Sequence, residues 1–440
     1  MTDDDSESPR RFEDETRHNS PGDRRVSRRQ LLHAGAAASV GVTAGCARFA
    51  PTAAPQTLEE PTAASQALPT RPDTIYMHDV ERTGYWPEQS VPSAVEMAWA
   101  EPGINTGSHT AAKSSPLVYD GDVIVPGDTG TVRSFTPAGE QNWTASLASS
   151  TRGTHSTPAI VENYIFTAGY DGAVYAFDVD SGDRLWRTRV SDAIGSSPVY
   201  YDGVVYCATE FYEPSGGMVA LDAATGGIIW EDNRMTNHAH SITGLDPDAG
   251  VFAAGCNDGS LYVWDLADRS YRGRFETGDA IKGPICMSDG LAIFGSWDGN
   301  VYAVDVDSLS QVWRYETDYK IMSGPAVHPD TDTVVIGTHG DSLLGLDGTT
   351  GRRNWDVDCG GWIIGGVTIA DETALVGSYD RTLFAVDVRR GVERFRFERP
   401  RGRVTSTPAV SDGDIYVTER GVFDGDTLEQ SGALYKLTGV

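Results

Sequence analysis

Lysine is nearly absent from this 440-residue chain, although other charged residues are plentiful. Only four of its 35 basic residues are lysines, and its 63 acidic residues bring the formal net charge to −28. The four are Lys113, Lys282, Lys320 and Lys436. Such acidity argues against nucleic acid and anionic lipid surfaces as partners, because like charges repel. It predicts a solvated acidic surface typical of a salt-adapted protein. The alternative is a surface that binds a basic partner.

Closely spaced cysteines are also missing. The chain has Cys46, Cys207, Cys256, Cys286 and Cys359, with no C-x-x-C pair and no two adjacent. This spacing gives no support for zinc knuckles or vicinal disulfides. Once the first cysteine is set aside, four remain. An exported protein could join them in two bridges or keep them buried and free, and the sequence does not choose between these arrangements.

Common catalytic motifs are absent as well. The chain has no Gly-x-Ser-x-Gly elbow, P-loop or His-Glu-x-x-His. Residues 178–183 imitate part of a calcium loop, but the glutamate at position 12 and the following helix are lacking, so we predict a turn there. We therefore predict no catalytic, cofactor-binding or metal-binding residues. The sequence leans against an enzyme without deciding the question.

The first seventy residues have the features of an export signal followed by a spacer. Residues 1–26 are polar, mixed in charge and predicted to be disordered. Arg28 and Arg29, followed by a weakly apolar stretch too short to span a bilayer, resemble a twin-arginine export signal. The sequence Thr-Ala-Gly-Cys ending at Cys46 resembles a lipoprotein processing box, which would make this cysteine the lipid attachment. Residues 47–70 predict an extended stalk rich in Ala, Pro and Thr.

A repeat fills residues 71–440. Its pattern is a tight turn, an apolar strand, a second turn and a strand that carries a large aromatic, as in residues 169–186. In five copies an aspartate stands eight residues before the aromatic: Asp178/Trp186, Asp222/Trp230, Asp305/Trp313, Asp347/Trp355 and Asp387/Phe395. Asp-Gly pairs between apolar strands predict hairpins. In residues 173–178 both alternating faces are apolar, which predicts a strand covered on both sides.

The spacing of the aromatics predicts the number of repeats. They are Trp99, Trp143, Trp186, Trp230, Phe275, Trp313, Trp355 and Phe395, on average about 42 residues apart, as in four-stranded propeller blades. Trp99 has no three strands of its own before it, and the last unit, residues 406–437, lacks an outer strand. We therefore predict an all-β, eight-bladed propeller of antiparallel blades, closed by residues 95–99 as the outer strand of the last blade.

The unit Ala-x-Asp-x-x-(Thr/Ser)-Gly-x-x-x-Trp, present in residues 176–186 and 220–230, resembles the repeat of the PQQ-like propellers. That family includes quinoprotein alcohol dehydrogenases and BamB-type envelope assembly lipoproteins, and the resemblance covers residues 75–437. It implies that the eight aromatics dock each blade on the next. The units that end in Phe275 and Phe395 depart from the pattern, so packing there should be looser or bulged. Residues 82–85 resemble the lead-in segment of exported propellers.

Function is expected on one face of the ring. In an up-and-down blade, the loop before the innermost strand and the turn between the second and third strands emerge on the same face. We predict a binding face that comprises His109, His155, His238, His240, Lys282, Lys320, Trp362 and Arg403, with Phe211, Tyr212 and Phe423 on two long loops. The surrounding turns carry Asp128, Asp171, Asp258, Asp298, His339 and Asp380. Alternatively, the histidines only cap polar groups of the channel, or some of them chelate a metal.

The resemblance implies a non-catalytic scaffolding module that binds an envelope protein and no nucleic acid. The signal implies export by the twin-arginine route and a lipid anchor on the outer side of the cytoplasmic membrane. One alternative is a PQQ-dependent dehydrogenase with calcium, but adjacent cysteines are missing and no catalytic carboxylate can be matched. The other is a sensor that binds a small ligand at the ring centre.

Overall fold

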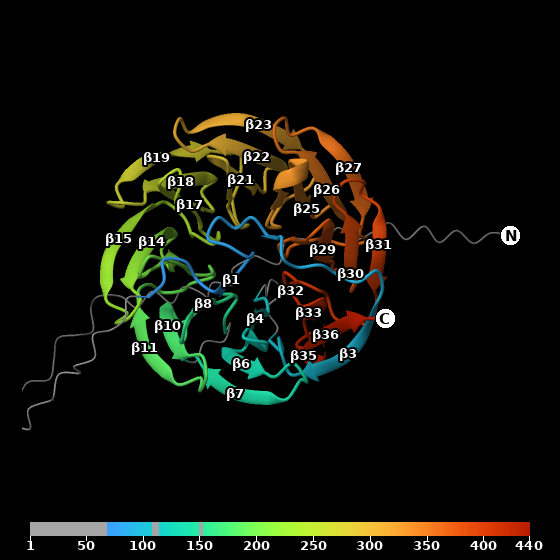
Figure 1. Cartoon of the computed structure of the whole chain (residues 1–440). Helices are drawn as coiled ribbons and strands as arrows, with labels where there is room; N and C mark the ends of the chain where they lie inside the picture. The colour runs from blue at the N-terminus through green and yellow to red at the C-terminus, as the bar shows by residue number, and fades with distance from the viewer. Residues whose placement is uncertain (1–67, 108–113, 149–152) are drawn as a thin grey trace, which may run out of the picture. The chain divides into compact units, whose positions relative to one another are not determined.

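Eight antiparallel sheets stand around a common axis in the computed structural model, which describes residues 68–107, 114–148 and 153–440 (Figure 1). The segment predicted to be disordered, the arginine pair, Cys46, nearly all of the predicted stalk and His109 lie outside the described residues. Each sheet is one blade with strands A to D from the axis outward. Blades 1 and 2 consist of β4 (Leu117–Tyr119), β5 (Asp122–Gly127), β6 (Thr131–Phe135) and β7 (Gln141–Ser146), and of β8 (Ala159–Val161), β9 (Tyr164–Gly169), β10 (Ala173–Asp178) and β11 (Arg184–Arg189). Blade 3 consists of β12 (Val199–Tyr201), β13 (Val204–Phe211), β14 (Ser215–Asp222) and β15 (Ile228–Met235). Blade 4 consists of β16 (Gly244–Asp246), β17 (Val251–Gly255), β18 (Ser260–Asp265) and β19 (Tyr271–Glu276).

The other four blades complete the ring. They are blade 5, β20 (Cys286–Ser288), β21 (Leu291–Gly295), β22 (Asn300–Asp305) and β23 (Ser310–Glu316); blade 6, β24 (Ala326–His328), β25 (Thr333–Gly337), β26 (Ser342–Asp347) and β27 (Arg353–Asp358), with the short helix η1 (Pro329–Thr331); blade 7, β28 (Thr368–Ala370), β29 (Thr373–Gly377), β30 (Leu383–Asp387) and β31 (Glu393–Phe397); and blade 8, β32 (Ala409–Ser411), β33 (Asp414–Thr418), β36 (Ala433–Gly439) and β3 (Val95–Pro102). β3 pairs with β36, so the predicted closure of an eight-bladed ring is confirmed.

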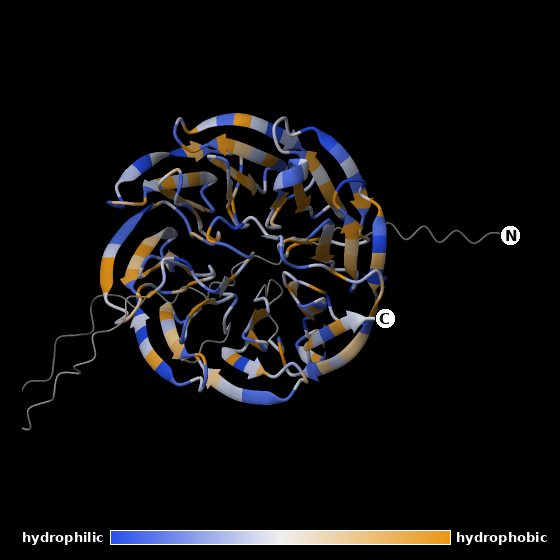
Figure 2. Cartoon of the chain, in the orientation of Figure 1, coloured by the Kyte–Doolittle hydropathy of each residue, from blue (hydrophilic) through white to orange (hydrophobic). Residues whose placement is uncertain are grey.

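The third strands are apolar on both faces because each blade is covered on both sides. In β10, Val174 and Ala176 join one buried cluster with blade 3, whereas Tyr175 and Phe177 join another with blade 1. The outermost strands mix hydrophilic and hydrophobic residues (Figure 2), and those of β11 alternate between exposed and half-buried over its outer part. The core therefore lies between blades, as the sequence of residues 173–178 predicts.

The glycine of the repeat makes room for the aromatic of the preceding blade. Trp143 donates its indole N–H to the Val179 carbonyl at 3.0 Å, on the C–D turn of blade 2. A Cβ on Gly182, whose φ is +72°, would come within 2.6 Å of that indole ring. Trp186, Trp313 and Trp355 make the same hydrogen bond to the next C–D turn.

The departures from this pattern occur where the next turn has no such glycine. Arg269 and Leu309 take the positive-φ position opposite Trp230 and Phe275. Phe395 faces blade 8, where strands C and D come from opposite ends of the chain and no C–D turn exists. The bulge predicted for the Phe275 unit is present, but the C–D strand pairs of all eight blades contain one.

Residues 74–86, which we call the plug, cross the middle of the ring (Figure 1). β1 (Thr74–Ile75) pairs with β8, and β2 (Tyr85–Trp86) pairs in parallel with β28. Between them, plug carbonyls accept the backbone N–H groups of Leu245, Met287 and Val327 from blades 4, 5 and 6. With the further contacts of Ile75, Tyr76 and Arg82 to blades 1, 8 and 3, the plug touches the inner strand region of every blade. The sequence of residues 74–86 does not indicate that they cross the middle of the ring.

Arg82 is the centre of the plug. It is fully buried with φ of 64°, and its guanidinium donates to the carbonyls of Tyr76, Pro198 and Thr243 at 2.6 to 3.1 Å. Burial lowers the pKa of Arg82 to about 10, so the side chain stays charged at neutral pH. The buried Arg82 side chain thus joins the plug to blades 3 and 4.

The four cysteines of the propeller, Cys207, Cys256, Cys286 and Cys359, are buried and free, which settles the alternative left open by the sequence. Burial raises the pKa of the Cys207 thiol to about 12, so this thiol is unreactive as a nucleophile. No helix among the described residues has the length and hydrophobicity needed to cross a bilayer.

Candidate functional site

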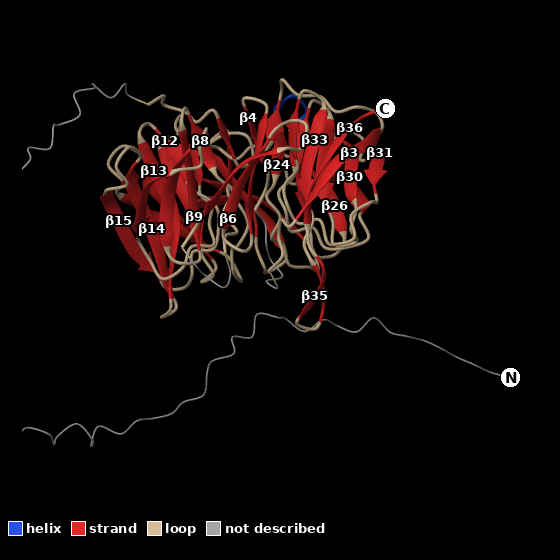
Figure 3. Ribbon diagram, turned by 90° about the horizontal axis from the view of Figure 1, so that it is seen from below, coloured by secondary structure: helices blue, strands red, loops and turns tan. Residues whose placement is uncertain are grey.

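The ring has two faces with different loops. The loops that join strand D of one blade to strand A of the next emerge with the B–C turns on one face, which we call the B–C face. The hairpin of β34 (Val422–Asp424) and β35 (Thr427–Gln430), a B–C connection, projects from it (Figure 3). η1 lies on the opposite face, which we call the A–B face, together with the A–B and C–D turns. Segment 419–431, predicted as a long loop, is thus largely a hairpin.

The predicted binding residues lie on the B–C face, but they differ in exposure. His155 is buried, and His238, His240, Lys282 and Lys320 are half-buried. Phe211 and Phe423 are also half-buried, whereas Tyr212 is 81% exposed and Trp362 is 39% exposed. Arg403 is exposed. The inner histidines therefore belong partly to the packing of the ring, and the accessible part of this face is aromatic.

All three strongly exposed aromatic side chains of the described residues lie on the B–C face. They are Tyr212 in the β13–β14 turn, Tyr319 in the loop before β24, and Trp362 in the loop before β28. Exposed aliphatic residues such as Val312 and Val392 lie instead on or beside outer strands. Exposed aromatics gathered on one face are the pattern expected of a binding surface.

Two lysines converge on one indole ring on this face. The ammonium of Lys282 lies 3.3 Å from the ring centroid of Trp297, and that of Lys320 lies 3.9 Å from it. Lys282 precedes β20 in blade 5, Trp297 lies in the β21–β22 turn of the same blade, and Lys320 precedes β24 in blade 6. Half of the lysines in the whole chain thus meet at a single aromatic ring.

The aromatic contacts continue across the next two blades. His339, in the β25–β26 turn, stacks on Trp362 with ring centroids 4.8 Å apart and 5° between the planes. Trp362 stacks in turn on Tyr379 at 5.6 Å, and the guanidinium of Arg403 lies 4.6 Å from the Tyr379 ring. We call Lys282, Trp297, Lys320, His339, Trp362, Tyr379 and Arg403 the arc, which extends from blade 5 to blade 8.

The repeat positions the arc residues. In blades 2 and 4 to 8 the B–C turn donates a backbone N–H to a carbonyl of the preceding D–A loop. His339 bonds to Lys320 at 3.0 Å, and Tyr379 bonds to Trp362 at 2.9 Å. On this recurring backbone, a side chain of one B–C turn contacts a D–A loop side chain of the next blade, as His339 contacts Trp362 and Tyr379 contacts Arg403.

Blades 3 and 4 hold a carboxylate between two histidines. Glu210, at the end of β13, lies 3.0 Å from His240 Nδ1 and 3.9 Å from His238 Nδ1, and accepts the Gly195 N–H. Burial pushes the pKa of Glu210 up, but the two histidines and this N–H outweigh burial and lower it. The cluster ties the β13–β14 hairpin, which carries Tyr212, to the neighbouring blade.

The acidic turns serve mainly the local structure. Asp298 accepts hydrogen bonds from Gly278 N and Tyr302 Oη, both at 2.7 Å, and Asp258 accepts from Tyr262 Oη in the same way. Despite burial, these bonds lower the pKa of both carboxyls. Burial and the bond to the carboxylate raise the pKa of Tyr302 to about 12. These carboxylates are engaged in their own turns.

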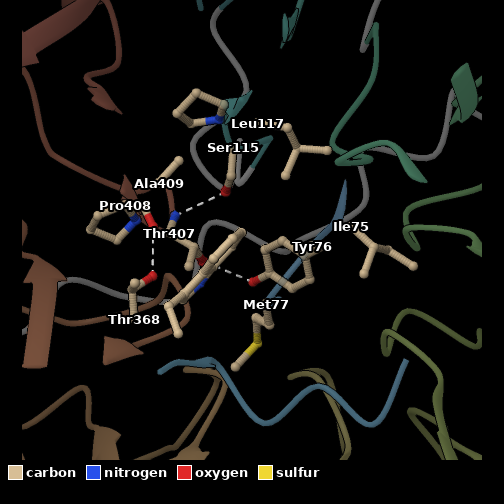
Figure 4. A pocket seen from close by; sticks show the side chains of 11 residues that line it. Ile75, Tyr76, Met77, Ser115, Leu117, Thr368, Thr407, Pro408 and Ala409 are labelled. Carbon is tan, nitrogen blue, oxygen red and sulfur yellow. Dashed lines mark hydrogen bonds between the residues drawn. The ribbon is translucent and has the colours of Figure 1, made fainter. Parts of the chain in front are cut away.

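The plug nearly fills its end of the ring channel. A cavity of about 10 Å³, room for a single water molecule, lies between Tyr76, Leu117 and Thr407 (Figure 4). Thr407 bonds to the Tyr76 hydroxyl at 3.0 Å. Within residues 68–107, 114–148 and 153–440, no three His, Cys, Asp or Glu side chains converge to hold a metal ion.

Sequence reasoning missed Trp297, Tyr319 and Tyr379. It selected the aspartate of the Gly-Ser-x-Asp turns, Asp298 and Asp380, although the preceding residue carries the surface. The signal was a large aromatic residue directly before the aspartate in the B–C turns of blades 5 and 7. Tyr319 could have been found by its place beside Lys320 in a D–A loop.

Comparisons with known proteins agree with the fold. A protein-family profile described as "Outer membrane protein assembly factor BamB" matches residues 107–274 and 297–433. The BamB of Yersinia pestis is 27% identical over 240 residues, which cover 50% of this chain and 58% of that protein. The match therefore spans less than two thirds of that relative. The BamB of Shewanella oneidensis is 23% identical over 354 residues, covering 74% of this chain and 87% of that protein.

A solved structure shows the same architecture. The quinohemoprotein alcohol dehydrogenase of Comamonas testosteroni superposes with a TM-score of 0.68 at 15% identity, covering 84% of this chain and 80% of that one. At this identity the likeness shows the fold alone.

Proposed function

Because this chain belongs to the BamB family of PQQ-like propellers, we propose that it is a non-catalytic scaffold that binds a protein of the cell envelope through its B–C face. The observation that carries the proposal is the position of Tyr212, Tyr319 and Trp362. All three strongly exposed aromatics of the described residues share this face, and buried aromatic anchors commonly dominate protein interfaces.

The attachment of the plug supports the choice of face. Asp202 in the A–B turn of blade 3 donates its N–H to the Thr70 carbonyl at 2.8 Å, and the Tyr200 hydroxyl donates to the Pro69 carbonyl at 2.6 Å. Pro69 and Thr70 therefore lie on the A–B side of blade 3, at the opposite end of the ring from the exposed aromatics.

Site-specific photo-crosslinking in the native membrane tests this proposal. A photoreactive residue at Tyr212 or Tyr319 should capture the same envelope protein. Placed at Val392, which is 57% exposed on the A–B side, it should not capture that protein. The Val392 variant is a matched control because its side chain is exposed and distant from the B–C loops. Capture of the same protein from Val392, or no common protein from the two tyrosines, would argue against the proposal.

We also propose that residues 1–46 direct export by the twin-arginine route, that Cys46 carries the lipid, and that residues 47–70 form the stalk of a propeller held outside the cytoplasmic membrane. Replacing both Arg28 and Arg29 by lysine should retain the protein in the cytoplasm. Replacing Cys46 by alanine should allow export but release the protein from membranes on fractionation. A membrane-bound Cys46→Ala protein would contradict the lipid anchor.

A further inference from the structure

We propose that the arc binds an acidic, extended peptide segment of the partner. This inference rests on the proposed function and names the chemistry of the segment that the B–C face takes. The arc offers three cations, Lys282, Lys320 and Arg403. It also offers the Trp297 ring and the stacked rings of His339, Trp362 and Tyr379.

The concentration of positive charge points to an anionic ligand. In a chain with a net charge of −28 and four lysines, two ammonium groups lie on the same indole ring, 3.3 and 3.9 Å from its centroid. This local concentration of positive charge in an acidic protein is complementary to the carboxylates of an acidic ligand. Arg403 is exposed at the far end of the arc, with a guanidinium suited to bidentate binding of a carboxylate.

The aromatic part supplies the apolar contact of such a segment. Trp362 is 39% exposed although His339 and Tyr379 stack against it, and Tyr319 beside Lys320 is 54% exposed. Successive side chains of an extended segment point to opposite sides. Side chains two residues apart therefore share a side, and a segment with apolar and acidic residues at such positions can pack on Trp362 while its carboxylates reach Lys320 and Arg403.

The overall charge favours a peptide over a nucleic acid. A nucleic acid carries one phosphate per nucleotide along its whole length, and its charge would be repelled by the acidic surface around the arc. A short acidic segment brings its carboxylates only to the arc. Asp298, the carboxylate next to Trp297, is engaged with Gly278, Asn300 and Tyr302 in its own turn.

Fluorescence anisotropy with the whole propeller tests the inference. The probes are a labelled peptide of repeating Glu-Ser-Leu-Ser, whose Glu and Leu side chains share one side when it is extended, the same peptide with Gln for Glu, and a labelled oligothymidylate. We expect the Glu peptide to bind at least tenfold more tightly than the Gln peptide, with affinity falling as salt rises. Lys320→Gln and Arg403→Gln should each weaken binding of the Glu peptide about tenfold. Trp362→Ala should weaken both peptides.

Arg390→Gln is the matched control, because Arg390 is exposed on the C–D turn of blade 7, on the A–B side. Equal binding of the Glu and Gln peptides, an equal loss in Arg390→Gln, or tighter binding of the oligothymidylate would overturn the inference. Crosslinking from Tyr212 and Tyr319 separates this failure from that of the proposed function. If one envelope protein is captured but the Glu peptide does not bind, the scaffold stands and the acidic segment is wrong.

Discussion

The two ends of the ring are built from opposite kinds of contact. At the A–B end, the plug inserts a buried arginine among backbone carbonyls and hydrogen bonds to one blade after another. At the B–C end, aromatic rings and cations from blades 5 to 8 meet side by side and remain partly exposed. The first end directs its arginine and backbone groups inward to the blades, and the second offers rings and charges outward. Substitutions at the two ends should therefore separate stability from binding.

The largest effect is expected at Arg82. Arg82→Ala removes the donors of three buried carbonyls and leaves a void, so the free energy of unfolding should fall by about 3 to 5 kcal/mol. Chemical denaturation measures this change. Arg71→Ala is the control, because Arg71 forms an exposed ion pair with Glu81 in the same segment and should cost less than about 1 kcal/mol. Equal midpoints for the two variants would show that the plug does not stabilise the ring.

A smaller effect is expected at the blade-docking turns on the A–B side. Gly351 has φ of +69°, and a Cβ there would lie 2.6 Å from the Trp313 ring. Gly290 has a similar φ of +74°, with nothing within 4 Å of its Cβ position. Both alanine variants meet the strain of positive φ, but only Gly351→Ala meets the indole. It should be less stable than Gly290→Ala by about 1 to 3 kcal/mol in urea denaturation. Equal stabilities would mean that Trp313 docking tolerates the extra carbon.

The plug should also make the stability of the protein depend on pH, through the buried carboxyl group of Asp79. Burial raises the pKa of Asp79 to about 6, so ionisation costs more in the folded state than in the unfolded chain. The stability from the protonated form is complete below pH 4 and is lost as pH rises through 6. Relative to Asp79→Asn, the wild type should therefore lose about 2 kcal/mol over this range. Thermal melts from pH 4 to 7 compare the two, and parallel curves would contradict the assignment.

The blades could be predicted because their sequence signals lie within single hairpins. The plug could not be predicted because its conformation depends on contacts with residues far away in the sequence. The spacing of Asp178 and Trp186 lies within one hairpin and recurs, so the repeat specified strand order, closure and the buried faces of β10. The plug residues Met77, His78 and Arg82 adopt positive φ only because the blades around them impose it, and nothing in residues 74–86 alone indicates this. Topology correctly placed the D–A loops and the B–C turns on one face, and the role of that face as a binding site stays a prediction. The contacts between Trp297, Trp362 and Tyr379 could not be predicted, because they join different repeats.

The smallest stability effect is expected at the B–C end, at Tyr212. This side chain is 81% exposed at the tip of the β13–β14 hairpin, so Tyr212→Ser should change the free energy of unfolding by less than about 0.5 kcal/mol. The same variant should weaken partner capture by a photoreactive residue placed at Tyr319, because both tyrosines lie on the B–C face. Denaturation and crosslinking on one preparation measure both. A destabilised Tyr212→Ser protein would mean that the B–C face also supports the fold, and the contrast between the two ends would be wrong.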